Sequence, residues 1–157
     1  MAHLKIGSSN HSLHTFSNQY AFYAHMSADQ TGISNNTWTK VNLVSESFGT
    51  FDTTNKRFDV PKTGKYQINY RLRWADGEYG RFTALYVDGS LSEHAGAVNF
   101  GFSSYTPTYY FSVLLNLTKG QTVELYGKQV SGSDKSIAHD DDSILQTAMS
   151  GFLVLGG

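Results

Sequence analysis

The feature that most constrains the fold is a strict alternation of apolar and polar side chains at residues 66–74. The even positions are all apolar or aromatic: Tyr66, Ile68, Tyr70, Leu72 and Trp74. The odd positions between them are all polar: Gln67, Asn69, Arg71 and Arg73. Successive side chains of a β-strand point to opposite faces, whereas a helix would mix the two sets on every side. The alternation therefore predicts a strand with one face in a core.

Similar patterns recur along the rest of the chain. Residues 109–117 also alternate, and Lys119-Gly120 then leads into an apolar segment at 123–127, which together predict a hairpin. Weaker strand patterns occur at residues 21–27, 38–45, 58–60, 83–87 and 151–155. Many short strands separated by turn residues are typical of an all-β sandwich or barrel.

The chain divides into a polar arm and one domain. Residues 1–20 show neither helical nor strand periodicity, so we expect an N-terminal arm there. Residues 21–157 suffice for one core and are too few for two ordinary domains. Ten Tyr and ten Phe can fill that core, while only 16% of the residues are charged, against roughly 25% in most globular proteins.

Charge and motifs exclude several classes of function. A formal net charge of −1 gives no field for attracting nucleic acid or anionic lipid, so we expect neither nucleic-acid binding nor membrane insertion. No apolar segment resembles a signal peptide or a membrane span. The chain has no Cys, and it lacks the nucleophile-elbow, P-loop and zinc-protease motifs. We therefore expect a protein that is not an enzyme.

Four segments, taken in order, carry a family resemblance. Ala-Phe-Tyr-Ala opens the domain at residues 21–24, and Phe-Asp-Val-Pro-Lys-Thr-Gly-Lys-Tyr-Gln-Ile-Asn-Tyr follows at 58–70. Val-Leu-Leu-Asn-Leu at 113–117 is followed by Gly-Gln-Thr-Val at 120–123, and Ser-Gly-Phe-Leu stands near the end, at 150–153. Together they resemble the globular head domain of the complement C1q family, within the wider TNF-like jelly-roll group.

The resemblance implies a specific architecture and assembly. It implies a two-sheet antiparallel jelly-roll sandwich of about ten strands that forms a compact homotrimer and binds ligands without catalysing reactions. One observation from the residues agrees with it: Phe152-Leu153-Val154-Leu155 is apolar on both faces, so this strand must be covered on both. A neighbouring subunit could supply the second cover. The sequence departs from the family pattern in having no Cys and no collagen stalk.

The segment after the alternating strand is the first candidate ligand site. It brings together five residues suited to carbohydrate: Trp74, Asp76, Glu78, Tyr79 and Arg81. An aromatic ring packs on the apolar face of a sugar, and carboxylate or guanidinium groups bind its hydroxyls. In the alternative interpretation, Trp74 ends the core face of its strand and an ordinary loop follows.

The second candidate site is a run of three carboxylates, Asp140, Asp141 and Asp142, before the last strand. Carboxylate oxygens suit Ca²⁺, and related domains sometimes hold this ion at the apex of the trimer, so calcium is a candidate cofactor. The run lacks the spaced pattern of a dedicated calcium loop, which leaves a solvated acidic loop as the alternative.

These observations favour a trimeric, non-catalytic recognition head that binds carbohydrate or a glycosylated surface, for example at the tip of a phage or bacterial fibre. We expect an extracellular, virion-associated or cell-surface location. Three alternatives stay open at this point: a secreted C1q-like ligand that binds a protein receptor, a purely structural trimerisation module, and a hydrolase that uses the Asp cluster. The chain's first expected partner is a second copy of itself.

Overall fold

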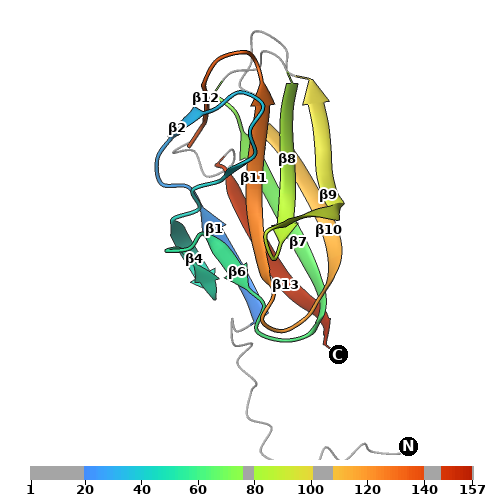
Figure 1. The fold of residues 1–157 in the computed structure, drawn as a ribbon. Helices are drawn as coiled ribbons and strands as arrows, with labels where there is room; N and C mark the ends of the chain where they lie inside the picture. Colours follow the sequence, from blue (N-terminus) through green and yellow to red (C-terminus); the bar gives the residue numbers. More distant parts are fainter. Residues whose placement is uncertain (1–19, 76–79, 101–107, 140–145, 157) are drawn as a thin grey trace, which may run out of the picture.

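A computed structural model describes residues 20–75, 80–100, 108–139 and 146–156, with the backbone alone at 93–100. These residues form two facing β-sheets, and every strand pair is antiparallel (Figure 1). The predicted all-β, two-sheet architecture is confirmed. No helix in the described part of the chain is long and apolar enough to cross a membrane.

One sheet has five strands in the order β10-β7-β13-β1-β4. Their bounds are Thr108–Leu117 (β10), Gly64–Arg73 (β7), Ala148–Gly156 (β13), Ala21–His25 (β1) and Ser45–Gly49 (β4). The long alternating segment that dominates the sequence is therefore an interior strand, β7, between the strand of the second alternating segment and the last strand of the chain. Trp74 extends β7 by an isolated bridge to Ile137.

The facing sheet has six strands, in the order β5-β6-β11-β8-β9 with β3 also beside β11. Their bounds are Phe51–Asp52 (β5), Arg57–Asp59 (β6), Thr122–Val130 (β11), Gly80–Val87 (β8), Ser90–Phe100 (β9) and Thr39–Lys40 (β3). A small third sheet pairs β12 (Lys135–Ile137) with β2 (Gln30–Ile33). Short strands such as β2, β3, β5 and β12 bring the number of described strands above the ten or so that were predicted.

The core lies between the two large sheets. From β7 it receives the apolar set of the alternating segment, Tyr66, Ile68, Tyr70, Leu72 and Trp74, all of which are buried. The ring of Phe22 stacks on that of Phe58 with centroids 4.4 Å apart, which joins β1 to β6 across the sandwich. Burial of these large side chains is the main force that holds the sheets together.

The predicted hairpin at Lys119-Gly120 is wrong. Strand β10 pairs with β7 along its whole length, whereas β11 pairs with β8, β6 and β3, so the turn carries the chain from one sheet to the other. A turn sequence shows where the chain reverses and does not choose the hydrogen-bonding partner. That choice follows here from the burial of both strands in opposite walls of the core.

A true hairpin joins β8 to β9 at Asp88-Gly89. Both residues have positive φ, 50° and 73°, as a two-residue turn between antiparallel strands requires. The Asp88 carboxylate also accepts a hydrogen bond from the backbone N–H of Thr122 at 2.8 Å. This bond lowers the pKa of Asp88, and the side-chain amide of Gln121 lowers it further.

The last strand is uncovered on one side, as its sequence suggested. In β13 the side chains of Phe152, Val154 and Leu155 are 47%, 53% and 62% exposed, while Leu153 packs against the core. The domain begins with β1 at Ala21, and Tyr20 is the only residue of the predicted arm that the structure describes.

Gly49, at the end of β4, offers a test of this packing. Its φ is +108°, and a Cβ atom there would lie 2.0 Å from the carbonyl oxygen of Ala21 in β1. We expect Gly49→Ala to lower the free energy of unfolding by about 2 kcal/mol or more, because it adds backbone strain to a clash with main-chain atoms. Gly32→Ala is the matched control, since Gly32 has a φ of +70° and open space around it. Equal losses for both variants in urea unfolding would contradict the close approach of β4 to β1.

Candidate functional site

The structure buries two of the predicted carbohydrate-binding residues. The Trp74 and Arg81 side chains are both 0% exposed, and the Arg81 guanidinium carbon lies 5.2 Å from the centre of the Trp74 ring. Trp74 is on the core face because it continues the alternation of β7, which is the alternative that the sequence left open. The burial of both side chains favours the core interpretation of Trp74 and Arg81, and the ligand-binding role of the segment stays a prediction.

The other predicted site residues lie outside the described part of the chain. These are Asp76, Glu78 and Tyr79 of the carbohydrate-binding segment and Asp140, Asp141 and Asp142 of the acidic run. Across the described residues, no three His, Asp or Glu side chains are grouped so as to hold a metal ion.

The outer face of the five-stranded sheet, which we call the five-strand face, is unusually apolar for a surface. Its large exposed side chains include Phe48 (44%), Tyr110 (57%), Leu114 (49%) and Phe152 (47%). The register places Phe152 on β13 and Leu114 on β10 on either side of Gln67 in β7. Exposed apolar groups gathered on one sheet face indicate a surface made for contact with another molecule.

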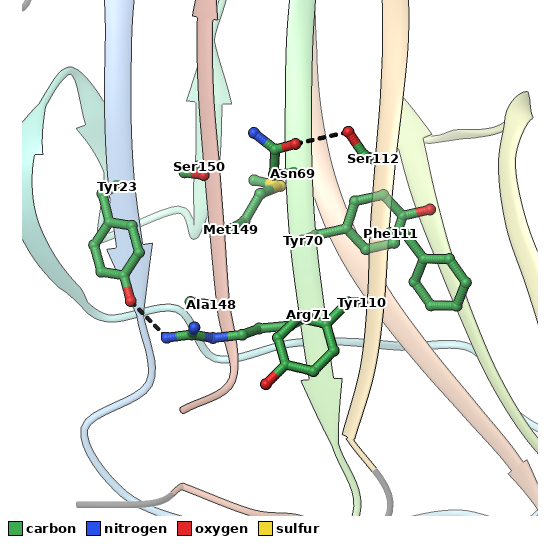
Figure 2. Close-up of a pocket in the computed structure, with 10 residues that line it drawn as sticks. All are labelled: Tyr23, Asn69, Tyr70, Arg71, Tyr110, Phe111, Ser112, Ala148, Met149 and Ser150. Carbon is green, nitrogen blue, oxygen red and sulfur yellow. Dashed lines mark hydrogen bonds between the residues drawn. The ribbon is translucent and has the colours of Figure 1, made fainter. Parts of the chain in front are cut away.

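A hollow of about 330 Å³ lies on the five-strand face, open to solvent. Figure 2 shows Tyr23 on one side of it and Tyr110 on the other. The floor between these rings is made by small or medium side chains: Ala148, Ser150, Ser112 and Asn69. The hollow exists because neighbouring strands place short side chains between long ones in the same rows of the sheet.

Arg71 crosses this hollow and is fixed in position. Its Nη2 donates a hydrogen bond to the hydroxyl of Tyr23 at 2.8 Å, and its Nε donates to the carbonyl oxygen of Gln146. Behind it, burial raises the pKa of Tyr70 to about 12, so this phenol stays protonated at neutral pH. The hollow thus combines aromatic walls with a positioned cation.

A second cavity, of about 320 Å³, lies at the open edge of the sandwich where β9 and β10 approach each other. Two of the side chains that line it, Leu91 and Leu114, are 52% and 49% exposed. Leu114 belongs to the five-strand face as well. The apolar surface therefore continues from this face around the edge of the molecule.

The outer face of the six-stranded sheet carries a different surface, which we call the aromatic platform. It consists of four half-buried rings: Trp38, Phe82, Tyr86 and Tyr126. Tyr86 and Tyr126 stack with centroids 4.0 Å apart, and Trp38 meets Tyr86 edge-on at 6.1 Å. The rings come from β8, β11 and the residue before β3, which is paired with β11.

Charged groups surround the platform. The ammonium group of Lys128 lies 5.8 Å from the centre of the Trp38 ring and 5.6 Å from that of Phe82. At the other end, the Lys40 ammonium is paired with the Glu124 carboxylate, which also accepts a hydrogen bond from the Tyr126 hydroxyl at 3.2 Å. Burial, followed by the charge of Glu124, raises the pKa of Tyr126, so its hydroxyl remains a hydrogen-bond donor at neutral pH.

The sequence analysis did not identify the platform. Residues 82 and 86 are partly exposed on either side of the buried residues 83–85 on β8, and residues 126 and 128 are partly exposed on either side of the buried residue 127 on β11. This periodicity could have shown that Phe82, Tyr86 and Tyr126 share an outward side. It could not have added Trp38, which joins them only because β3 pairs with β11.

The two faces suit different kinds of partner. The five-strand face is broad and apolar, with a hollow that a protruding side chain of another protein can fill, as at protein–protein interfaces. The platform is built from half-exposed rings with a carboxylate, hydroxyls and ammonium groups beside them. Such a combination binds flat molecules that have both apolar and hydroxyl-bearing surfaces.

Comparison with known proteins defines the fold. No protein-family model matches the sequence, and no curated protein matches it. Among solved structures, Eiger TNF from S. frugiperda is similar, with a TM-score of 0.64, 11% identity and coverage of 88% of this chain and 94% of that one. The globular domain of zebrafish complement 1qA protein has a TM-score of 0.60 and 15% identity, covering 88% and 100%. For murine APRIL the TM-score is 0.62, with 11% identity and coverage of 86% and 98%.

Proposed function

We propose that this chain, which has a C1q/TNF-like jelly-roll fold, is a homotrimeric and non-catalytic recognition head for carbohydrate or glycosylated surfaces. The observation that carries the proposal is the five-strand face, where Phe48, Tyr110, Leu114 and Phe152 are exposed on the outer side of a sheet whose inner side forms the core. The number three comes from the family resemblance. The location proposed with it is extracellular, on a virion or on a cell surface.

In a cyclic trimer, both cavities would lie at the contacts between protomers. In a cyclic trimer each protomer offers one surface to its neighbour on one side and a different surface to its neighbour on the other. The five-strand face, with its hollow, is one such surface, and the edge that carries Leu91 and Leu114 is the second. Apolar side chains of the edge would fill the hollow beside Arg71 and remove both surfaces from water.

Assembly in this way leaves the six-stranded sheet facing outward. The aromatic platform then becomes the ligand surface, which supports carbohydrate as the ligand class because flat rings lie beside hydrogen-bonding groups there. Asp76, Glu78 and Tyr79, outside the described residues, belong to the proposed ligand-binding set on the evidence of their composition alone.

A glycan array tests the ligand class. The wild-type protein is labelled and applied at a concentration at which it is a trimer by mass. The bound label is then measured in buffer and in EDTA. We expect binding to a restricted group of saccharides. If the protein is trimeric but binds no glycan, and instead captures a protein on cell surfaces stripped of glycans, the carbohydrate proposal is wrong. The chain would then be a ligand of a protein receptor.

The calcium proposal predicts a change in thermal stability. If Asp140, Asp141 and Asp142 bind Ca²⁺ in the folded trimer, the ion raises the melting temperature by mass action, and EDTA reverses the rise. Asp141→Asn should reduce the calcium-dependent rise while leaving the melting temperature in EDTA nearly unchanged. Scanning calorimetry that gives the same melting temperature with calcium and with EDTA would leave the run as a solvated acidic loop.

A further inference from the structure

The aromatic platform has an uneven distribution of charge. Lys128 lies over two of its rings, and it forms no ion pair or hydrogen bond with any other residue that the structure describes. Its cross-strand neighbour is Phe82, which offers no charge. Aromatic faces attract an ammonium group, but they carry no net negative charge that would balance it.

The acidic group of the platform is already neutralised. The Glu124 carboxylate is paired with Lys40 and accepts a hydrogen bond from Tyr126, and only 10% of its side chain is exposed. Lys40 also donates to the carbonyl oxygen of Asn55 at 3.3 Å, so its position is fixed from two sides. The rings of the platform therefore lie between a neutral polar pair at one end and an unbalanced positive charge at the other.

We propose that the aromatic platform binds a saccharide that carries a carboxylate, with the apolar face of the sugar on Trp38 and the carboxylate at Lys128. This inference rests on the proposed function and specifies its ligand class and its site. The carboxylate supplies the charge that Lys128 lacks within the protein. The hydroxyls of the sugar lie toward the other end of the platform, where the half-buried Tyr126 phenol oxygen is a hydrogen-bonding group.

The position of the platform favours a saccharide over an acidic peptide. Peptides commonly bind sheets by adding a strand to an open edge. Here β8 is paired on both sides, with β11 and β9, and β11 is paired with β8 and with β6 and β3. Among the described residues, the strands that carry Phe82, Tyr86 and Tyr126 are thus paired on both sides beneath the rings, so recognition there uses side chains, and a flat sugar ring matches flat aromatic faces.

A polyanion such as nucleic acid is disfavoured by the same charges. Nucleic-acid binding depends on many Lys and Arg side chains along a groove. The platform offers one unpaired ammonium group among the described residues, in a chain whose formal net charge is −1. One carboxylate per bound sugar is the charge that this site can balance.

The test compares acidic saccharides with neutral counterparts of nearly the same shape. The probes are tri-galacturonate and 3′-sialyllactose, each compared with its own methyl ester and titrated calorimetrically into the wild-type protein. We expect at least one acidic probe to bind about threefold to fivefold more tightly than its neutral counterpart, the size expected for one partly exposed ion pair. The difference should shrink as the NaCl concentration rises.

Two variants assign the effect to the platform. Lys128→Met keeps an apolar stem over the rings and removes the charge, so it should abolish the preference for the acidic probe over its neutral counterpart. Trp38→Ala should weaken both probes about tenfold or more, because it removes the surface on which the sugar rests. Lys119→Met, at the exposed turn before β11, is the matched control and should change neither affinity.

The outcomes separate this inference from the proposed function. If the acidic and neutral probes bind equally, or if Lys128→Met weakens both alike, the assignment of a carboxylate to Lys128 is overturned. Saccharide binding that survives Lys128→Met and Trp38→Ala in folded trimers moves the site elsewhere and leaves the carbohydrate function intact. Binding of a poly-glutamate peptide in place of every saccharide would overturn both.

Discussion

Phe152→Glu is expected to turn the proposed trimer into folded monomers. Phe152 is 47% exposed on the outer side of β13, so a glutamate there meets water in the isolated protomer and costs little. In the trimer the same carboxylate would be buried against the neighbour without a partner, once in each of three contacts. An unpaired buried charge costs several kcal/mol, so the effect on three contacts exceeds the free energy that holds a typical small assembly together.

Val130→Glu is the matched control for this experiment. Val130 is 37% exposed and lies on β11, in the opposite sheet, so the same change of side chain should leave the trimer intact. Leu114→Glu on β10 should act like Phe152→Glu. Leu153 is a poorer probe because its side chain packs against the core. Light scattering and circular dichroism together distinguish a folded monomer from an unfolded chain, and a folded Phe152→Glu trimer would exclude the five-strand face from assembly.

Trp74→Ala is expected to cause the largest loss of stability from a single core change. The ring is fully buried at the end of β7 and packs beneath the Arg81 guanidinium. Its removal should lower the free energy of unfolding by about 3–5 kcal/mol, since it forfeits both the burial of a large ring and its packing contacts. The indole N–H makes no hydrogen bond within the described residues, so little of this loss is polar.

The same variant distinguishes a core residue from a ligand-binding one. Urea unfolding at one fixed protein concentration gives the loss of stability, and glycan titration at a low temperature gives the affinity of the molecules that remain folded. We expect the affinity per folded trimer to be unchanged. Trp38→Ala should show the reverse, with a stability loss under about 2 kcal/mol and a large loss of affinity. A ligand-specific defect in folded Trp74→Ala would restore the sequence-based interpretation of this residue.

The parts of the fold that the sequence predicted are those where burial repeats with a short period. The alternation at 66–74 correctly assigns each side chain of β7 to the core or to the outer face, because an interior strand has one buried side along its length. Pairing was less predictable. Lys119-Gly120 turns the chain between sheets, and nothing local distinguishes that turn from a hairpin, because the partner strands lie far away in sequence.

The candidate sites were less predictable than the fold because their residues are adjacent in space and distant in sequence. Trp74 and Arg81 looked like a ligand-binding segment by composition, and the packing of the two sheets buries both. Trp38 and Lys128 are 90 positions apart, and they meet only because β3 pairs with β11. By contrast, the uncovered apolar side of β13 could be predicted directly from the sequence, since no polar side chain interrupts residues 152–155.

The mass of the wild-type protein in solution tests the central claim most directly. Sedimentation velocity or light scattering at low micromolar concentration should give one species of three times the 17.4 kDa chain. The mass should not change on moderate dilution, because subunits joined by an apolar contact as large as a sheet face have a low dissociation constant and separate slowly. A stable 17.4 kDa monomer across this concentration range would contradict the account, since the five-strand face would then remain exposed to water.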